Sequence, residues 1–339
     1  MLEKIKTYVG KDKFYMIFVL TFFSAFGALL EIIVLTSLAL FVTLLVDTSL
    51  FLENIPFKEL EDYLLSLTKK DLIYKVSYFV LILVLLKTII ITLIHYIEIS
   101  FLAKIKLKNN VSLFSYYITR NYKFYLNKFL PEMLTNSFYE VERAHNFLIQ
   151  TFAFMREILL SILIFYVLFT KNLIITVVCF VTFAIFGLIY FFLVKNYLTK
   201  KSEETTFFTN KLFNLFTNAL EDIRFIKIIN CEKKYIQNNL QFQSKVVNAV
   251  KYFTFYSRLP RAFLELLGIL TFIIAVFYFL SIGNNTTLII SELSIFGFAI
   301  LRLIPVFSLI VSNAQQLRFH HKSFLKITDE ISTFNLETI

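Results

Sequence analysis

The chain has 339 residues, of which 58% are hydrophobic and only 17% are charged. A soluble domain carries about 25% charged residues, so this composition excludes an ordinary soluble protein and predicts an all-α membrane protein. The formal net charge of +10 fits basic loops beside a membrane, and we expect no nucleic-acid partner.

Six apolar runs each reach the roughly 20 residues that a helix needs to cross a bilayer. In chain order they cover residues 14–46, 72–100, 151–170, 173–194, 262–282 and 287–312. Because lipid offers no hydrogen-bond partners, we expect each run to be a helix. The first run is too long for the core of a signal peptide, so we expect it to be a retained span.

The segments between these runs differ sharply in charge. Residues 47–71 carry six acidic residues and three lysines. Residues 101–150 carry seven Lys or Arg against three Glu, and residues 195–261 carry twelve against five acidic residues. Because positive charge gathers in cytoplasmic loops, we expect the two long basic segments and both termini in the cytoplasm.

The two long basic segments are expected to be helical hairpins that project from the membrane. The chain contains no Gly or Pro from Leu188 through Leu259. A helical extension of 20–25 residues would project roughly 30–40 Å. Asn, Asp and Pro favour breaks at residues 121–131 and 218–230, which predicts a short connecting helix at the tip of each hairpin.

The acidic segment after the first run contains PFKELEDYLLSL, residues 56–67. Its apolar residues recur at helical spacing, which favours an amphipathic helix that lies on the outer face of the membrane.

Charged residues inside the apolar runs are the first candidates for function, since each costs perhaps 2.5–3.5 kcal/mol on insertion scales. One interpretation is a substrate cavity that attracts a phosphate or pyrophosphate headgroup and is formed by Lys87, Arg261, Arg302 and Glu265. Arginine suits this role because its planar fork binds phosphate oxygens in a bidentate way. The alternative is internal pairing of Arg302 with Glu265 or Glu31, and of Lys87 with Glu98 beside His95.

Four short stretches resemble the transmembrane domain of ABC exporters. PEMLTNSFYEVERA (131–144) and LEDIRFIKIINCEKKY (220–235) are similar to the family's two cytoplasmic coupling regions. LPRAFLELLG (259–268) and SIFGFAILRLIP (294–305) resemble flippases for lipid-linked oligosaccharides in bacterial protein N-glycosylation. The resemblance implies an exporter fold over residues 1–325, with a tail at 326–339 where an ATPase linker would begin.

The resemblance also implies partners and a location. The protein would be a homodimer in the bacterial inner membrane that moves a lipid-linked substrate outward. The second hairpin of each copy would reach across to the other copy. The helix at 56–67 would contact the lipid tail of the substrate. The hairpin tips would dock an ATPase through Glu132, Phe138, Tyr139, Phe225 and Ile226. Alternatively, these side chains pack within the hairpins.

The chain has no G-x-x-x-x-G-K-[ST] loop to hold phosphates, so we expect ATP and magnesium on a separate ATPase. No catalytic or cofactor-binding motif is present, no histidine has the spacing of a zinc site, and we expect His320 and His321 to be solvated. Two alternatives to a pump stay open: a non-pumping remnant or regulatory scaffold, and a membrane-embedded transferase.

Overall fold

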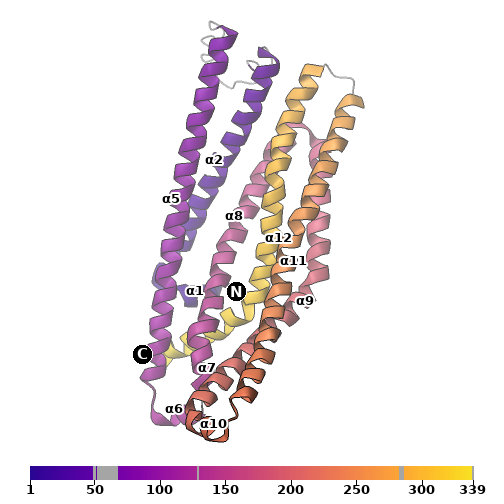
Figure 1. The fold of residues 1–339 in the computed structure, drawn as a ribbon. Coiled ribbons are helices and arrows are strands. Elements are labelled where there is room, and N and C mark those ends of the chain that lie inside the picture. The colour runs from indigo at the N-terminus through magenta and orange to yellow at the C-terminus, as the bar shows by residue number, and fades with distance from the viewer. Residues whose placement is uncertain (49–50, 52–67, 128–129, 282–285, 338–339) are drawn as a thin grey trace.

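The structure is a computed structural model that describes residues 1–48, 51, 68–127, 130–281 and 286–337. The described residues form helices and no strand. Six long helices run side by side along one axis (Figure 1). They are α2 (Tyr15–Val46), α5 (Lys69–Ile118), α8 (Val141–Lys171), α9 (Leu173–Glu221), α11 (Glu232–Ser281) and α12 (Thr286–Glu337).

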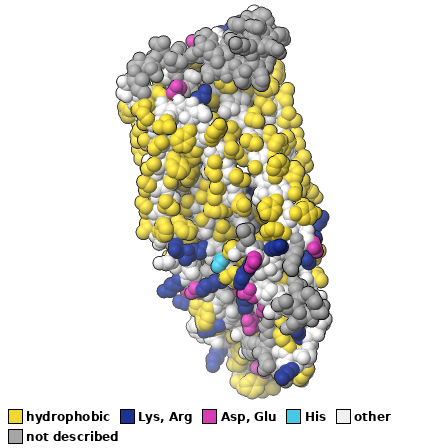
Figure 2. Space-filling model, turned by 180° about the vertical axis from the view of Figure 1, so that it is seen from behind, with side chains coloured by type: hydrophobic (Ala, Val, Ile, Leu, Met, Phe, Trp, Pro, Cys, Tyr) yellow, Lys and Arg dark blue, Asp and Glu magenta, His cyan; other side chains and the backbone are white. Residues whose placement is uncertain are grey.

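Each of these six helices is long and apolar enough to cross a membrane, which confirms the predicted multi-pass membrane protein,. Figure 2 shows apolar side chains as a band across the face in view, with Lys and Arg gathered along its lower edge. Side-chain caps fix two helix starts: the Asp71 amide donates to Thr68 Oγ1 (3.3 Å), and the Ile175 amide donates to Asn172 Oδ1 (3.2 Å),.

The predicted hairpins are helical, as expected. Helices α5, α9 and α11 are 49–50 residues long and continue well beyond the apolar runs. The first tip contains α6 (Tyr122–Asn127), α7 (Leu130–Thr135) and the π-helix η2 (Asn136–Glu140); the second contains α10 (Ile223–Ile229). Both tips lie at the same end of the molecule, which we call the hairpin side (Figure 1).

The second tip turns where Asn230 adopts a left-handed conformation, with φ 55°. Asparagine tolerates this region better than most residues, because its short polar side chain can bond locally. The turn lies at the end of the predicted break over 218–230.

Two large apolar cores and two smaller clusters hold the described helices together, and α12 contributes to both large cores. One core joins α2, α8, α9, α11 and α12 around Phe183, Phe296 and Leu303. The other lies toward the hairpin side, where α1 (Leu2–Val9) packs with α5, α8 and α12 around Tyr8, Phe147 and Phe324. Helix α12 is therefore the central support of the fold.

Helix α12 continues without a break past residue 325, where a tail was expected to begin. Ile327 and Ile331 are buried in the hairpin-side core, and Lys4 of α1 pairs with Asp329 at 2.8 Å. The described residues thus show no boundary at 325/326. The predicted amphipathic helix at 56–67 lies outside the described residues.

Candidate functional site

Glu31 holds two cations from two other spans in the middle of the apolar band. Its Oε1 lies 3.1 Å from Lys87 Nζ, and its Oε2 lies 2.6 Å from Arg302 Nη2. Helix α2 carries the glutamate, whereas α5 and α12 carry the cations. The Glu31 side chain is only 12% exposed, so the three charges satisfy one another where water is scarce.

These three side chains line a cavity of about 270 Å³. Apolar groups form the rest of its wall: Val34, Leu35, Leu38, Phe298 and Leu301. The Arg302 side chain remains 39% exposed, and its buried Nε has no hydrogen-bond partner among the described atoms. The exposed part of this side chain, and not the buried Nε, is therefore what the cavity offers to a further acceptor,.

A second group of charges lies beside the first. Arg156 Nη1 is 3.3 Å from Glu98 Oε2, and Arg156 Nε is 3.4 Å from Glu157 Oε1. Glu157 also interacts electrostatically with Arg302 and Glu31, which connects the two groups. Three carboxylates thus face three cations, and their formal charges cancel. The cavity itself is lined by two of the cations and one of the carboxylates, Lys87, Arg302 and Glu31.

Sequence reasoning missed Arg156 and Glu157, although both lie in the predicted span 151–170. The rule applied to Lys87, that a charge in an apolar run needs a partner or a wet face, would have found them.

The structure brings together only two of the four residues predicted for the cavity, Lys87 and Arg302. Arg261 and Glu265 pair with each other at 3.0 Å on an exposed face of α11. The alternative pairing of Lys87 with Glu98 is not formed, because Lys87 bonds Glu31 and Glu98 bonds Arg156. Of the two partners considered for Arg302, the structure gives Glu31.

The hairpin tips present apolar side chains to solvent. Phe138 of η2 is 71% exposed and Phe225 of α10 is 62% exposed. Ile226 is only 3% exposed, so its expected exposure is wrong: it lies on the inner face of the short helix, and Ile228 faces outward. Tyr139 is partly buried beside the Arg143 guanidinium.

Glu132, the fifth residue predicted for docking, pairs with Lys326 of α12 at 3.0 Å. The expectation that His320 is solvated is also wrong. Its ring is buried because α12 continues into the hairpin-side core instead of ending at the membrane.

We compared the chain with known proteins. No family model matches it. A search of curated proteins finds no match either. Among the described residues, no three His, Cys, Asp or Glu side chains are grouped closely enough to hold a metal ion. The site's chemistry therefore follows from its own charges and shape.

Two buried polar junctions fasten the hairpins to α12. The Arg143 guanidinium, on α8, donates to Ser202 Oγ (2.6 Å) and to the Phe319 carbonyl (2.7 Å), and it also bonds Thr206. It therefore joins the start of α8 to α9 and α12.

The second junction lies near the first tip. Asn136 Nδ2 donates to Glu330 Oε1 (3.0 Å), while Tyr117 OH donates to Glu330 Oε2 (2.7 Å). Burial and the neighbouring Glu330 carboxylate raise the pKa of Tyr117, so its hydroxyl stays a donor,.

Proposed function

We propose that this chain is the membrane subunit of an ATP-driven exporter or flippase for a lipid-linked substrate that carries phosphate. The observation that supports this most is the cavity at Glu31. Lys87 and Arg302 line it from two different spans, and the rest of its wall is apolar. Apolar walls suit a lipid chain, and two cations suit a phosphate headgroup.

Glu31 has a defined role in this proposal, as an internal counter-ion. While the cavity holds no substrate, the carboxylate pairs with both Lys87 and Arg302 and offsets one of their two positive charges. A phosphate group, with a charge of about −1.5 to −2 at pH 7, competes with one carboxylate for the same donors. The Arg302 side chain is 39% exposed, so binding can begin at the exposed part of the guanidinium.

The hairpins supply the proposed link to a motor. ATP and magnesium would be bound by a separate ATPase that docks at the tips, where Phe138 and Phe225 are exposed as apolar anchors,. Closure of the ATPase would move the hairpins together and turn the cavity outward by rigid-body rocking.

A homodimer is part of the same proposal. The second hairpin carries large apolar side chains that are well exposed outside the apolar band: Phe216, Leu220, Ile236 and Leu240. Exposed apolar surface of this kind marks a protein contact, and a second copy reached by a crossing hairpin would cover it.

A regulatory membrane scaffold is the second candidate function. It is favoured by the ion pairs themselves, because Lys87 and Arg302 both have a carboxylate partner without any ligand. In that case the charges only hold α2, α5 and α12 together.

One experiment separates the two functions. The adjacent reading frame is first searched for an ATPase with a phosphate-binding loop. That ATPase is then reconstituted with the chain in vesicles, and ATP hydrolysis is measured with and without a polyprenyl diphosphate lipid. We expect Arg302→Ala to reduce stimulation by the lipid at least tenfold, whereas Lys245→Ala, on an exposed part of α11, leaves it unchanged. Equal stimulation in both variants would support the scaffold.

A further inference from the structure

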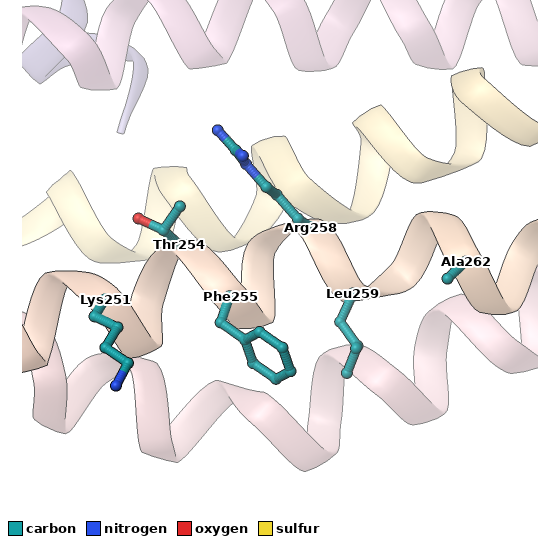
Figure 3. Close-up of a pocket in the computed structure, with 6 residues that line it drawn as sticks. All are labelled: Lys251, Thr254, Phe255, Arg258, Leu259 and Ala262. Carbon is teal, nitrogen blue, oxygen red and sulfur yellow. The ribbon is translucent and has the colours of Figure 1, made fainter.

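A shallow groove of about 620 Å³ lies on one face of α11 (Figure 3). Its wall is made by side chains that recur every three or four residues along this helix: Lys251, Thr254, Phe255, Arg258, Leu259 and Ala262. The groove shares no residue with the cavity at Glu31. It is therefore a separate site.

The groove combines two cations with an apolar floor. Lys251 and Arg258 are exposed, and neither forms an ion pair with a carboxylate in the part of the chain that the structure describes. Arg261, three residues further on, is by contrast neutralised by Glu265. Phe255, between the two cations along the helix, and Leu259, next to Arg258, offer apolar surface. In Figure 3 these two side chains point to the same side of α11 as Lys251, whereas Arg258 points to the other side.

The predicted span 262–282 places the groove at the edge of the membrane. Ala262 begins the predicted span 262–282, and a rise of 1.5 Å per residue places Arg258 about 6 Å before it. The headgroup layer is about 5–7 Å thick on each side of the hydrocarbon core, so Arg258 lies at the depth of lipid phosphates. Lys251 is about 16 Å from Ala262, on the aqueous side of that layer, where its charge still attracts anions within a Debye length of about 8 Å.

We propose that this groove binds the headgroup of an anionic phospholipid from the leaflet on the hairpin side. The lipid phosphate lies against Arg258, Lys251 attracts the outer part of the headgroup, and the first carbons of an acyl chain follow Leu259 and Ala262 toward the bilayer. Charge complementarity selects this occupant, because two cations without described acidic partners favour an anion over a zwitterionic lipid.

The test uses the full chain in lipid nanodiscs that contain phosphatidylglycerol or only phosphatidylcholine. Native mass spectrometry counts the lipids that stay bound after release from the disc. Each basic residue near a membrane surface contributes about fivefold to anionic-lipid binding. We therefore expect Lys251→Ala with Arg258→Ala to reduce retention of phosphatidylglycerol about 25-fold, and circular dichroism checks that the variant is folded.

The matched control is Lys234→Ala with Lys245→Ala, which removes two exposed charges from the same helix, farther from the membrane. It should retain phosphatidylglycerol as the unaltered chain does, and excess inorganic phosphate should not displace the lipid. The proposal is overturned if the unaltered chain retains phosphatidylcholine as well as phosphatidylglycerol. It is also overturned if both double variants lose phosphatidylglycerol to the same extent. So does disulfide crosslinking of Thr254→Cys between two copies in the presence of the anionic lipid, since the groove is then an interface between copies.

Discussion

Glu31 is the residue on which the cavity's charge depends, because it is the ion-pair partner of both Lys87 and Arg302. Changing Glu31 to Gln removes the negative charge and preserves the size of the side chain. We expect about fivefold tighter apparent binding of the polyprenyl diphosphate lipid, because the two cations lose a competing partner in a partly exposed site. The concentration of lipid that half-stimulates ATP hydrolysis measures this.

The control for this change is Glu3→Gln, on the exposed side of α1, which should not alter the half-stimulating concentration. An equal or weaker apparent affinity in the Glu31→Gln variant, with the protein folded, would show that Glu31 does not compete with the substrate.

His320 is expected to make stability depend on pH. Burial and the nearby Arg143 guanidinium lower the pKa of His320 to about 3, whereas an unfolded histidine titrates near 6.5. The unfolded chain therefore binds a proton first, so the stabilising contribution is complete above pH 6.5 and is lost as the pH falls toward 3.

Changing His320 to Gln should flatten the decline of the free energy of unfolding below pH 6.5, by up to about 1.4 kcal/mol per pH unit. Thermal unfolding followed by circular dichroism at pH 7.5, 6.5 and 5.5 measures the slope. His321→Gln, at a partly exposed position, should change the slope less. Identical slopes for His320→Gln and the unaltered chain would contradict this.

At this scale the sequence could identify the charges in the spans but not their partners. Helical periodicity places Lys87 and Glu98 on one stripe of a single helix, yet it does not say which neighbouring helix faces that stripe. The partners came from α2 and α8. Only packing of the six helices brings these groups together.

At the scale of the elements, the Arg143 junction is the contact that fastens the start of α8 to α9 and α12. Its guanidinium is buried and hydrogen-bonded to Ser202 and to the Phe319 carbonyl. Changing Arg143 to Met would remove its hydrogen bonds to Ser202, Thr206 and the Phe319 carbonyl, of which only the carbonyl keeps another donor, Ser202 Oγ. We therefore expect a loss of about 2–4 kcal/mol in unfolding free energy. Thermal unfolding would show a melting temperature lower by several degrees.

Lys104→Met is the matched control, since Lys104 is exposed on α5 and its removal should leave the melting temperature within about a degree. An equally small change for Arg143→Met would mean that the junction does not hold the hairpins.

The elements were predictable to different degrees. Clusters of Asn, Asp and Pro correctly placed the breaks at both tips, since these residues favour caps and turns. The continuation of α12 to Glu337 was not predicted, because the polar residues after 312 hide an apolar stripe that packs against α1 and α8.

On the scale of the whole molecule, the fold connects a charged cavity in the apolar band to two rigid hairpins on one side. Helix α12 belongs to both regions: it carries Arg302 in the cavity and Glu330 at the junction with the first tip. In the proposed transporter, this continuous helix would carry a movement of the tips to the cavity at Glu31.

The most direct test of this account takes an ATPase with a phosphate-binding loop, sought in the adjacent reading frame, and measures its ATP hydrolysis in vesicles. The unaltered chain is compared with a variant that combines Phe138→Asp and Phe225→Asp. These exposed side chains can be changed without disturbing a core. The account predicts that the unaltered chain binds the ATPase and confers hydrolysis stimulated by the polyprenyl diphosphate lipid, and that the double variant is folded but loses both properties. Two results would contradict the account. One is lipid-stimulated ATP hydrolysis that is as strong with the double variant as with the unaltered chain. The other is the absence of lipid-stimulated hydrolysis with the unaltered chain.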